Sequence, residues 1–283
     1  MFRSTFVIAI VAIVLNCMAL AVAQSGTYTQ VDYPQAAYTF AYAINDKGEI
    51  VGAYVDDLGF LHGYLLSGGV FTPINFRTDY SDTVAAGINN VGQIVGWSLN
   101  GHGFLYDSVG KVFHALDYPG AVGTYPVSIN NTGGKTGTFS FTGGVNELMG
   151  FQCLGSTCNQ ITPTGMPATV AGITDAAAVF GTLSAPFRFA HGRYQRFMIP
   201  GEPEARLSGV NFAGTALVGW MTPYGLRGFI YRAGVLRILN FPGSPNTQAS
   251  GVNEDGVVVG TFFDSDGISH GFVWTPGEAP TNY

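Results

Sequence analysis

Two groups of carboxylates could do chemistry: Asp56-Asp57, and Asp264 with Asp266 in the segment Asp264-Ser-Asp266-Gly267. Paired carboxylates about 5 to 10 Å apart act as acid and base or nucleophile in glycosidases. The second segment also resembles the opening of a calcium-binding loop, but the bidentate glutamate that closes such a loop is missing. We therefore expect solvated loop carboxylates and no metal. Asp57 and Asp266 are the carboxylates on which an enzyme would have to rely.

Histidine recurs at one position of the sequence pattern. His62, His102 and His270 each begin a His-Gly-Phe or His-Gly-Tyr tripeptide. Catalytic histidines rarely occur as three equivalent copies. We therefore predict a structural role, in which a buried imidazole satisfies a neighbouring loop carbonyl.

Asparagine recurs three residues before a glycine, and the copies are Asn45, Asn89, Asn130, Asn211 and Asn253. Asparagine at the first and glycine at the fourth position are typical of a type I turn, in which the asparagine side chain bonds the backbone ahead of it. A ring of metal ligands is the alternative. A hard cation would need converging carboxylates as well, so we predict turns.

Common catalytic signatures are absent from the sequence. It contains no Gly-x-Ser-x-Gly elbow, HExxH motif, P-loop or Rossmann fingerprint, so we name no catalytic residue and expect no cofactor. Lysine and arginine number 12 against 18 aspartates and glutamates. This acidic balance argues against nucleic acid as a partner, because phosphate binding needs a basic surface.

The residues above belong to an internal repeat. Copies of an Ile-Asn or Val-Asn dipeptide, with divergent ones at Ile173-Thr174 and Val210-Asn211, follow one another at intervals of 44, 41, 44, 37 and 42 residues. Each copy reads as four short strands separated by glycine-rich turns. Four strands in about 42 residues is the size of one blade of a β-propeller. An open β-solenoid and a pair of sandwiches are the alternatives.

The chain ends distinguish these folds. No fourth strand follows Trp274, whereas Tyr28, Val31 and Tyr33 match a fourth-strand pattern that also occurs at Leu236, Leu239 and Phe241. A strand moved from one end of the chain to the other makes sense only if the ends meet. We therefore predict an all-β, six-bladed propeller of four-stranded blades, its last blade completed by residues 26–33.

At this point the repeats resemble the HAF family of extracellular repeat proteins, named for a His-Ala-Phe-like tripeptide that is His-Gly-Phe or His-Gly-Tyr in this chain. The resemblance covers residues 26–275 and implies an exported protein without supplying a catalytic set. The fourth repeat departs most, having Thr174 in place of asparagine, Ala177 in place of glycine, and no His-Gly.

Residues 1–23 have the features of a secretory signal peptide. Arg3 is their only charge, Phe6 to Leu15 is an apolar run, and Ala21-Val-Ala23 places small residues before a cleavage site at Gln24. The run is shorter than the ~20 residues of a transmembrane helix. We expect secretion to the extracellular space or periplasm without membrane insertion after cleavage. Residues 24–283 would form a single domain and a monomer.

Cys153 and Cys158 flank the four residues Leu-Gly-Ser-Thr, which read as a hairpin loop. In an oxidising compartment these cysteines should form a disulfide between adjacent strands. Closing so short a loop stabilises by roughly 2 kcal/mol on the chain-entropy model. The spacing does not match a CxxC redox pair, and no histidines lie near enough in sequence for a zinc site.

Ligands of propellers usually bind where the loops between second and third strands surround the channel mouth. These loops carry the aromatic residues Tyr54, Trp97, Phe139, Phe141, Trp220, Tyr224, Phe262 and Phe263. Such rings suit sugars or extended peptides, unless they pack between blades. We name six of them as candidate ligand-binding residues: Tyr54, Trp97, Phe139, Phe141, Trp220 and Tyr224. The loop of blade 4 is much shorter than that of blade 3. We therefore predict a groove there, walled by the blade 3 loop and by Trp220 and Tyr224.

The favoured function is a recognition module that binds an extracellular glycan or peptide. An extracellular hydrolase or lyase acting on carbohydrate is the first alternative, and a structural envelope or matrix protein is the second. Paired carboxylates beside a cleft would favour the enzyme, whereas a plugged channel with buried aromatic residues would favour the structural protein.

Overall fold

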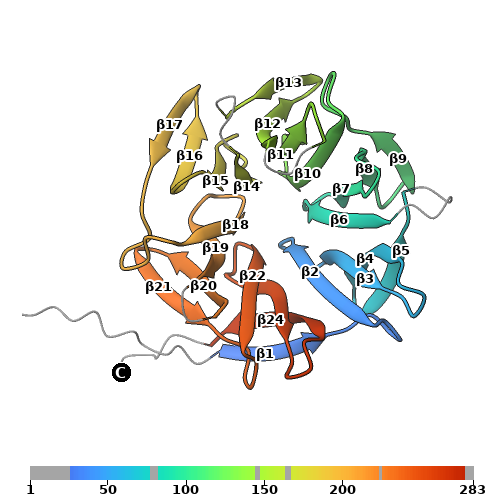
Figure 1. Ribbon diagram of the computed structural model, residues 1–283, viewed down its shortest axis with the longest axis vertical. Coiled ribbons are helices and arrows are strands. Elements are labelled where there is room, and N and C mark those ends of the chain that lie inside the picture. Colours follow the sequence, from blue (N-terminus) through green and yellow to red (C-terminus); the bar gives the residue numbers. More distant parts are fainter. Residues whose placement is uncertain (1–25, 77–81, 144–146, 163–166, 223–224, 278–283) are drawn as a thin grey trace, which may run out of the picture.

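A computed structural model describes residues 26–76, 82–143, 147–162, 167–222 and 225–277. Within these ranges the chain forms six four-stranded antiparallel sheets around a central axis (Figure 1). The predicted six-bladed propeller is confirmed. No helix in this part of the chain is long and apolar enough to cross a membrane. The predicted signal peptide and Tyr224 lie outside the described residues.

Each blade runs from an innermost to an outermost strand. Blades 1 to 3 comprise, in that order, β2 (Tyr38–Ile44), β3 (Ile50–Val55), β4 (Leu61–Ser67) and β5 (Val70–Ile74); β6 (Thr83–Ile88), β7 (Gln93–Ser98), β8 (Gly103–Asp107) and β9 (Val112–Ala115); and β10 (Gly123–Ile129), β11 (Lys135–Ser140), β12 (Met149–Leu154) and β13 (Thr157–Gln160). Blades 4 to 6 comprise β14 (Thr169–Ile173), β15 (Val179–Thr182), β16 (Pro186–Ala190) and β17 (Arg193–Arg196); β18 (Arg206–Val210), β19 (Ala216–Met221), β20 (Arg227–Arg232) and β21 (Val235–Leu239); and β22 (Asn246–Val252), β23 (Val258–Phe263), β24 (Ser269–Pro276) and β1 (Gly26–Val31).

The N-terminal strand closes the ring as predicted. β1 pairs antiparallel with β24, so that Gly26 lies opposite Pro276 and Val31 opposite Gly271. Figure 1 shows the blue β1 beside the red β24. Hydrogen bonds of one blade therefore join the two ends of the described chain, which makes closure part of the sheet itself.

The hydrophobic core lies between neighbouring blades. Phe104, from a His-Gly-Phe tripeptide, has no exposed surface and packs in one cluster with Val51 and Ile74 of the preceding blade. It lies opposite Gly96 of β7. A Cβ on Gly96 would collide with the Phe104 ring and with the Val84 carbonyl oxygen. The glycine of the repeated Val-Gly motif thus leaves the space that the aromatic ring of the His-Gly-Phe motif occupies.

The repeated asparagines form the predicted turns. In blade 1 the carbonyl oxygen of Asn45 accepts a hydrogen bond from the N–H of Gly48 (3.1 Å), and its Oδ1 accepts from the N–H groups of Lys47 and Glu49, both at 3.0 Å. Gly48 has φ of 76°, a left-handed conformation that favours glycine. The side chain of Asn45 is fully buried.

The same asparagines also connect the blades, a role that the sequence analysis missed. In four places the Nδ2 group donates to a backbone carbonyl of the next blade: Asn45 to Asn89 (3.1 Å), Asn89 to Asn130 (3.0 Å), Asn130 to Thr174 (2.7 Å) and Asn253 to Asn45 (3.3 Å). We call the six equivalent residues, Asn45, Asn89, Asn130, Thr174, Asn211 and Asn253, the amide belt. The belt surrounds one end of the channel.

Blades 4 and 5 close the belt by other bonds. Thr174 has no side-chain amide, and the N–H of Asp175 donates instead to the Phe212 carbonyl at 2.9 Å. Asn211 donates to Oε2 of Glu254 at 2.7 Å. Described donors and acceptors therefore link every pair of neighbouring blades around the axis.

A disulfide joins Cys153 of β12 to Cys158 of β13, which lie opposite each other in register. This pairing of adjacent strands confirms the prediction from the sequence.

Replacing Asn89 by Ala should lower the free energy of unfolding by about 2 to 4 kcal/mol, because the buried Asn130 carbonyl and two N–H groups of the turn would lose their partner. Urea unfolding would measure the change. Asn159→Ala is the matched control, since Asn159 is exposed on the outermost strand of blade 3. Equal effects of the two substitutions would contradict a structural role for the belt.

Candidate functional site

A cavity of about 470 Å³ occupies the channel at the end opposite the amide belt. Its wall comes from the innermost strands of the six blades and from residues at or near the ends of β7, β19 and β23. Loops between second and third strands continue from these strand ends, so the cavity opens on the face that we predicted to carry the site. Its volume is typical of small-ligand pockets.

Aromatic rings dominate the lining of this channel-mouth cavity. They belong to Phe40, Tyr42, Trp97, Trp220 and Phe263. Trp97 is wedged edge-on against Tyr125, with 5.5 Å between ring centroids. Burial raises the pKa of Tyr42 to about 12, so its hydroxyl stays neutral and can donate a hydrogen bond at physiological pH.

Arg206 is the single charged residue among the described residues that line the cavity. It begins β18 and lies opposite Trp220 in register, with its guanidinium carbon 5.6 Å from the centre of the indole ring. None of the described lining residues is Asp, Glu, His or Cys. The cavity therefore offers apolar contact, neutral hydrogen bonding and one cation.

A second cavity, of about 310 Å³, lies above blade 4 and shares Arg206 with the first. The short connection Thr182–Ser184 forms one side of it, and residues 203–206 and Thr222 form the other. The predicted groove thus has a counterpart, but its placement needs correction. We predicted that the blade 3 loop would form one wall, but none of its described residues lines the second cavity. The connection between blades 4 and 5 forms that wall instead.

Two of the six aromatic residues predicted to bind a ligand line the channel-mouth cavity: Trp97 and Trp220. Phe263, on one of the same loops, lines it as well. Phe141 is 49% exposed but lies beside Tyr118, outside the cavity. Tyr224 falls outside the described residues.

The prediction that Tyr54 and Phe139 bind a ligand needs correction, because both side chains are buried between blades. The ring of Tyr54 stacks on Tyr33 with centroids 3.5 Å apart, and that of Phe139 stacks on Tyr118 at 3.8 Å. Phe262 is stacked in the same way on Phe241, at 3.6 Å. These stacked rings pack between neighbouring blades, and neither Tyr54 nor Phe139 presents a face to a ligand.

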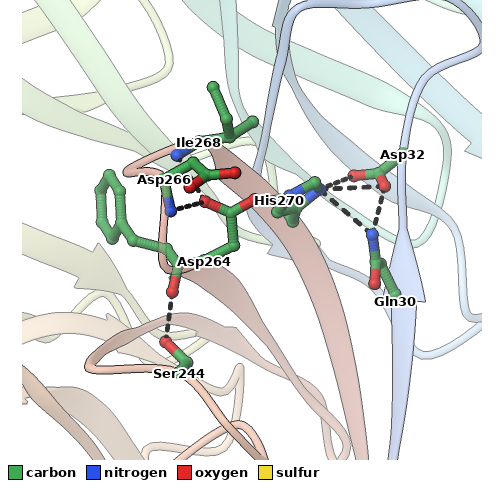
Figure 2. Close-up of polar contacts among 8 residues, drawn as sticks. Gln30, Asp32, Ser244, Asp264, Asp266, Ile268 and His270 are labelled. Atoms are coloured by element: carbon green, nitrogen blue, oxygen red, sulfur yellow. Dashed lines mark hydrogen bonds and ion pairs between the residues drawn. The ribbon is translucent and has the colours of Figure 1, made fainter.

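The repeated histidines form side-chain clamps on the same face as the cavity. His270 places Nδ1 3.1 Å from Oδ1 of Asp32 and Nε2 3.4 Å from Oδ2 of Asp264. Figure 2 shows this ring between the two carboxylates, with Gln30 beside it. The clamp ties the loop after β23 to the residue that follows β1. It therefore secures the strand pair that closes the ring.

The other two histidines have equivalent partners. His62 contacts Asn75 through Nδ1 (3.0 Å) and Asp56 through Nε2 (3.1 Å), and His102 contacts Asp117 through Nδ1 (3.0 Å). The prediction of a buried histidine facing a carbonyl was wrong in its partner and its burial. The side chains of His62, His102 and His270 are 27%, 44% and 21% exposed and face carboxylate or amide oxygens.

The predicted acidic residues divide into two kinds. Asp56 and Asp264 cap their own turns; Oδ1 of Asp264, for example, accepts from the N–H groups of Asp266 and Ile268, both at 2.9 Å. Asp57 and Asp266 are exposed. None of the four lines either cavity.

Sequence reasoning missed Phe40, Tyr42 and Arg206. Phe40 and Arg206 stand five residues before a belt residue, and Tyr42 stands three residues before one. The same two positions in other repeats supply Ser208, Gln248 and Ser250 to the cavity. Alternate residues of a strand face the same side. This spacing could therefore have identified the channel lining.

Acid should weaken the Asp264 clamp. The hydrogen bond from the N–H of Ile268 holds the pKa of the Asp264 carboxyl below its ordinary value, although desolvation raises it. His270 and the N–H of Asp266 also lower this pKa. A lowered folded-state pKa means that the stabilisation is complete above the unfolded value, near 3.9, and is lost as the pH falls through the folded one. Asp264→Ala should accordingly lower the Tm at about pH 7, and the difference in Tm from the unmodified protein should narrow as the pH falls below the unfolded-state value.

Thermal melts across this pH range would test the clamp. Asp266→Ala removes a neighbouring carboxylate that forms no side-chain hydrogen bond among the described residues, and should change the Tm little. A Tm difference for Asp264→Ala that does not vary with pH would argue against the clamp.

Comparisons with known proteins support the architecture. No family model matches the chain, and no curated protein matches it. Among solved structures, a gluconolactonase from Xanthomonas campestris is similar with a TM-score of 0.56 and 13% identity, over 92% of this chain and 93% of that one. The Aleuria aurantia lectin in complex with Fucα1-6GlcNAc gives a TM-score of 0.53 at 10% identity, over 87% and 98%. An oligogalacturonate lyase from Vibrio parahaemolyticus gives 0.53 at 10%, over 90% and 98%. At these identities the likeness shows that the chain shares their fold.

Proposed function

We propose that this protein is a secreted recognition module that binds a carbohydrate in the channel-mouth cavity. The observation that carries the proposal is the lining itself, in which Trp97, Trp220 and three further aromatic residues surround a space of about 470 Å³. A sugar ring presents C–H groups on its faces and hydroxyl groups at its edge. Aromatic walls match the faces, and scattered polar groups match the edge.

Polar side chains are available for such hydroxyl groups. Gln248 and Ser250 line the cavity, and neither side chain is hydrogen-bonded within the described part of the chain. Tyr42 adds a neutral hydroxyl that has no partner among the described residues. These groups can donate to and accept from a saccharide, which an entirely apolar pocket could not do.

The composition of the lining supports recognition over hydrolysis. General acids and bases are usually His, Asp, Glu, Cys, Lys or Tyr, and Tyr42 is the single one of these among the described lining residues. Its raised pKa makes it a poor base at neutral pH. Asp57 and Asp266, the carboxylates that an enzyme would need, stand outside the cavity.

Three features support an extracellular setting. The sequence of residues 1–23 fits an export signal, the Cys153–Cys158 disulfide fits an oxidising compartment, and the repeats resemble the HAF family. The fold is also used by the lectin that was solved in complex with Fucα1-6GlcNAc. A monomer that exposes one channel mouth would meet glycans of a cell surface or matrix.

A glycan array followed by calorimetry on the best ligand tests the proposal. Trp97→Ala and Trp220→Ala should each weaken binding by about tenfold or more, which corresponds to about 1.4 kcal/mol of lost stacking. Phe141→Ala is the matched control, because this exposed aromatic lies on the same face but outside the cavity. It should leave the affinity unchanged, and melting curves would confirm that all variants fold.

Two outcomes would contradict the proposal. Binding that survives both tryptophan substitutions would place the site elsewhere. A protein that ignores every glycan but selects an extended peptide from a display library would show that the cavity serves a different class of ligand.

A further inference from the structure

We infer that the saccharide carries a carboxylate and that Arg206 is the residue that selects it. This inference rests on the proposed function of the channel-mouth cavity and names the chemical class of its ligand. It begins with the state of the guanidinium group. The side chain of Arg206 forms no ion pair and no hydrogen bond within the described part of the chain, and the ion pairs found there join histidine to aspartate. Its five N–H donors are therefore available.

Trp220 holds this guanidinium in place without using its donors. The two residues lie opposite each other on β18 and β19, and the guanidinium carbon is 5.6 Å from the indole centre. A cation above an aromatic face is attracted by the π-electrons, while its N–H groups point outward in the plane of the guanidinium. That planar fork matches the two oxygens of a carboxylate.

The surrounding charges place the carboxylate on the side of the channel-mouth cavity. No described Asp or Glu lines that cavity, so Arg206 sets the sign of the charge there. The second cavity contains Glu204, whose carboxylate accepts a hydrogen bond from Thr222 at 3.2 Å. An anionic ligand would be repelled on the Glu204 side and attracted on the aromatic side.

The position of Arg206 also explains why the ligand should be an acidic sugar rather than a small anion. The guanidinium borders a lining of five aromatic rings, so an ion bound there alone would leave most of the cavity unused. A uronic-acid residue has a ring for the aromatic wall and a carboxylate on the same unit for the guanidinium. Neutral sugars of the same shape would satisfy only the first requirement.

The experiment compares matched ligands. A panel of uronic-acid oligosaccharides of several linkages is measured beside the same oligosaccharides after their carboxyl groups have been reduced to hydroxymethyl groups. The unmodified protein should bind an acidic member at least about tenfold more tightly than its reduced form, a difference of about 1.4 kcal/mol. Arg206→Gln should remove this preference while it retains binding of the reduced form.

Arg196→Gln is the control for charge. Arg196 lies on the outermost strand of blade 4, away from both cavities, so its substitution changes the net charge equally and should preserve the preference. Arg206→Lys keeps the charge but loses the fork, and should retain part of the preference.

The possible failures are distinguishable. If reduced and acidic forms bind equally, and Trp220→Ala still weakens binding by about tenfold or more, the inference about Arg206 is overturned and the proposed carbohydrate site stands. An acidic preference that Arg206→Gln leaves intact would likewise overturn the role of Arg206. If neither form binds and the glycan array is also silent, both the inference and the proposed function fail.

Discussion

The structure depends on one interaction, the hydrogen bond from the side-chain amide of a belt asparagine to a carbonyl of the next blade. Separate sheets share no backbone ladder, so polar backbone groups that meet at the axis need another source of partners. Asn89 provides partners on two sides. Its Oδ1 accepts hydrogen bonds from N–H groups of its own turn, and its Nδ2 donates to the Asn130 carbonyl of the next blade. One residue type thus fixes both the hairpin and the spacing between blades. Such a buried, satisfied amide would be costly to lose.

Because the belt fixes one end of the channel, residues at the other end are free to differ. Positions that face the cavity include Phe40 in blade 1, Val84 in blade 2 and Arg206 in blade 5, although all three stand five residues before a belt residue. The asymmetry is greatest around blade 4, where Thr174 replaces the asparagine and the second cavity opens beside Thr182–Ser184. A repeating scaffold can therefore carry one site instead of six.

The sequence predicted the fold well because its strongest signals come from the scaffold. Asparagine turns, Val-Gly strands and the displaced β1 recur or complement each other at measurable intervals. The site was harder to predict, since loop aromatics were grouped without regard to the direction of each side chain. Trp97 and Trp220 immediately follow the second-strand glycine and line the cavity, whereas Tyr54 and Phe139 stand two residues after it and pack between blades. Successive residues of a strand point to opposite faces, and that alternation separates the two groups.

Composition could not reveal the charge of the ligand for a related reason. A formal net charge of −6 describes the whole surface, and it argues against a long polyanion that must lie across that surface. A ligand inside the cavity responds to the charges beside it, because solvent ions screen exposed charges beyond about 8 Å at physiological ionic strength. Arg206 is the one charged residue among the described residues of the lining, and its guanidinium forms no ion pair with them. The charge of the site is therefore set by the residue that the innermost strand of blade 5 places at the channel. Identifying that residue requires the register of the strand.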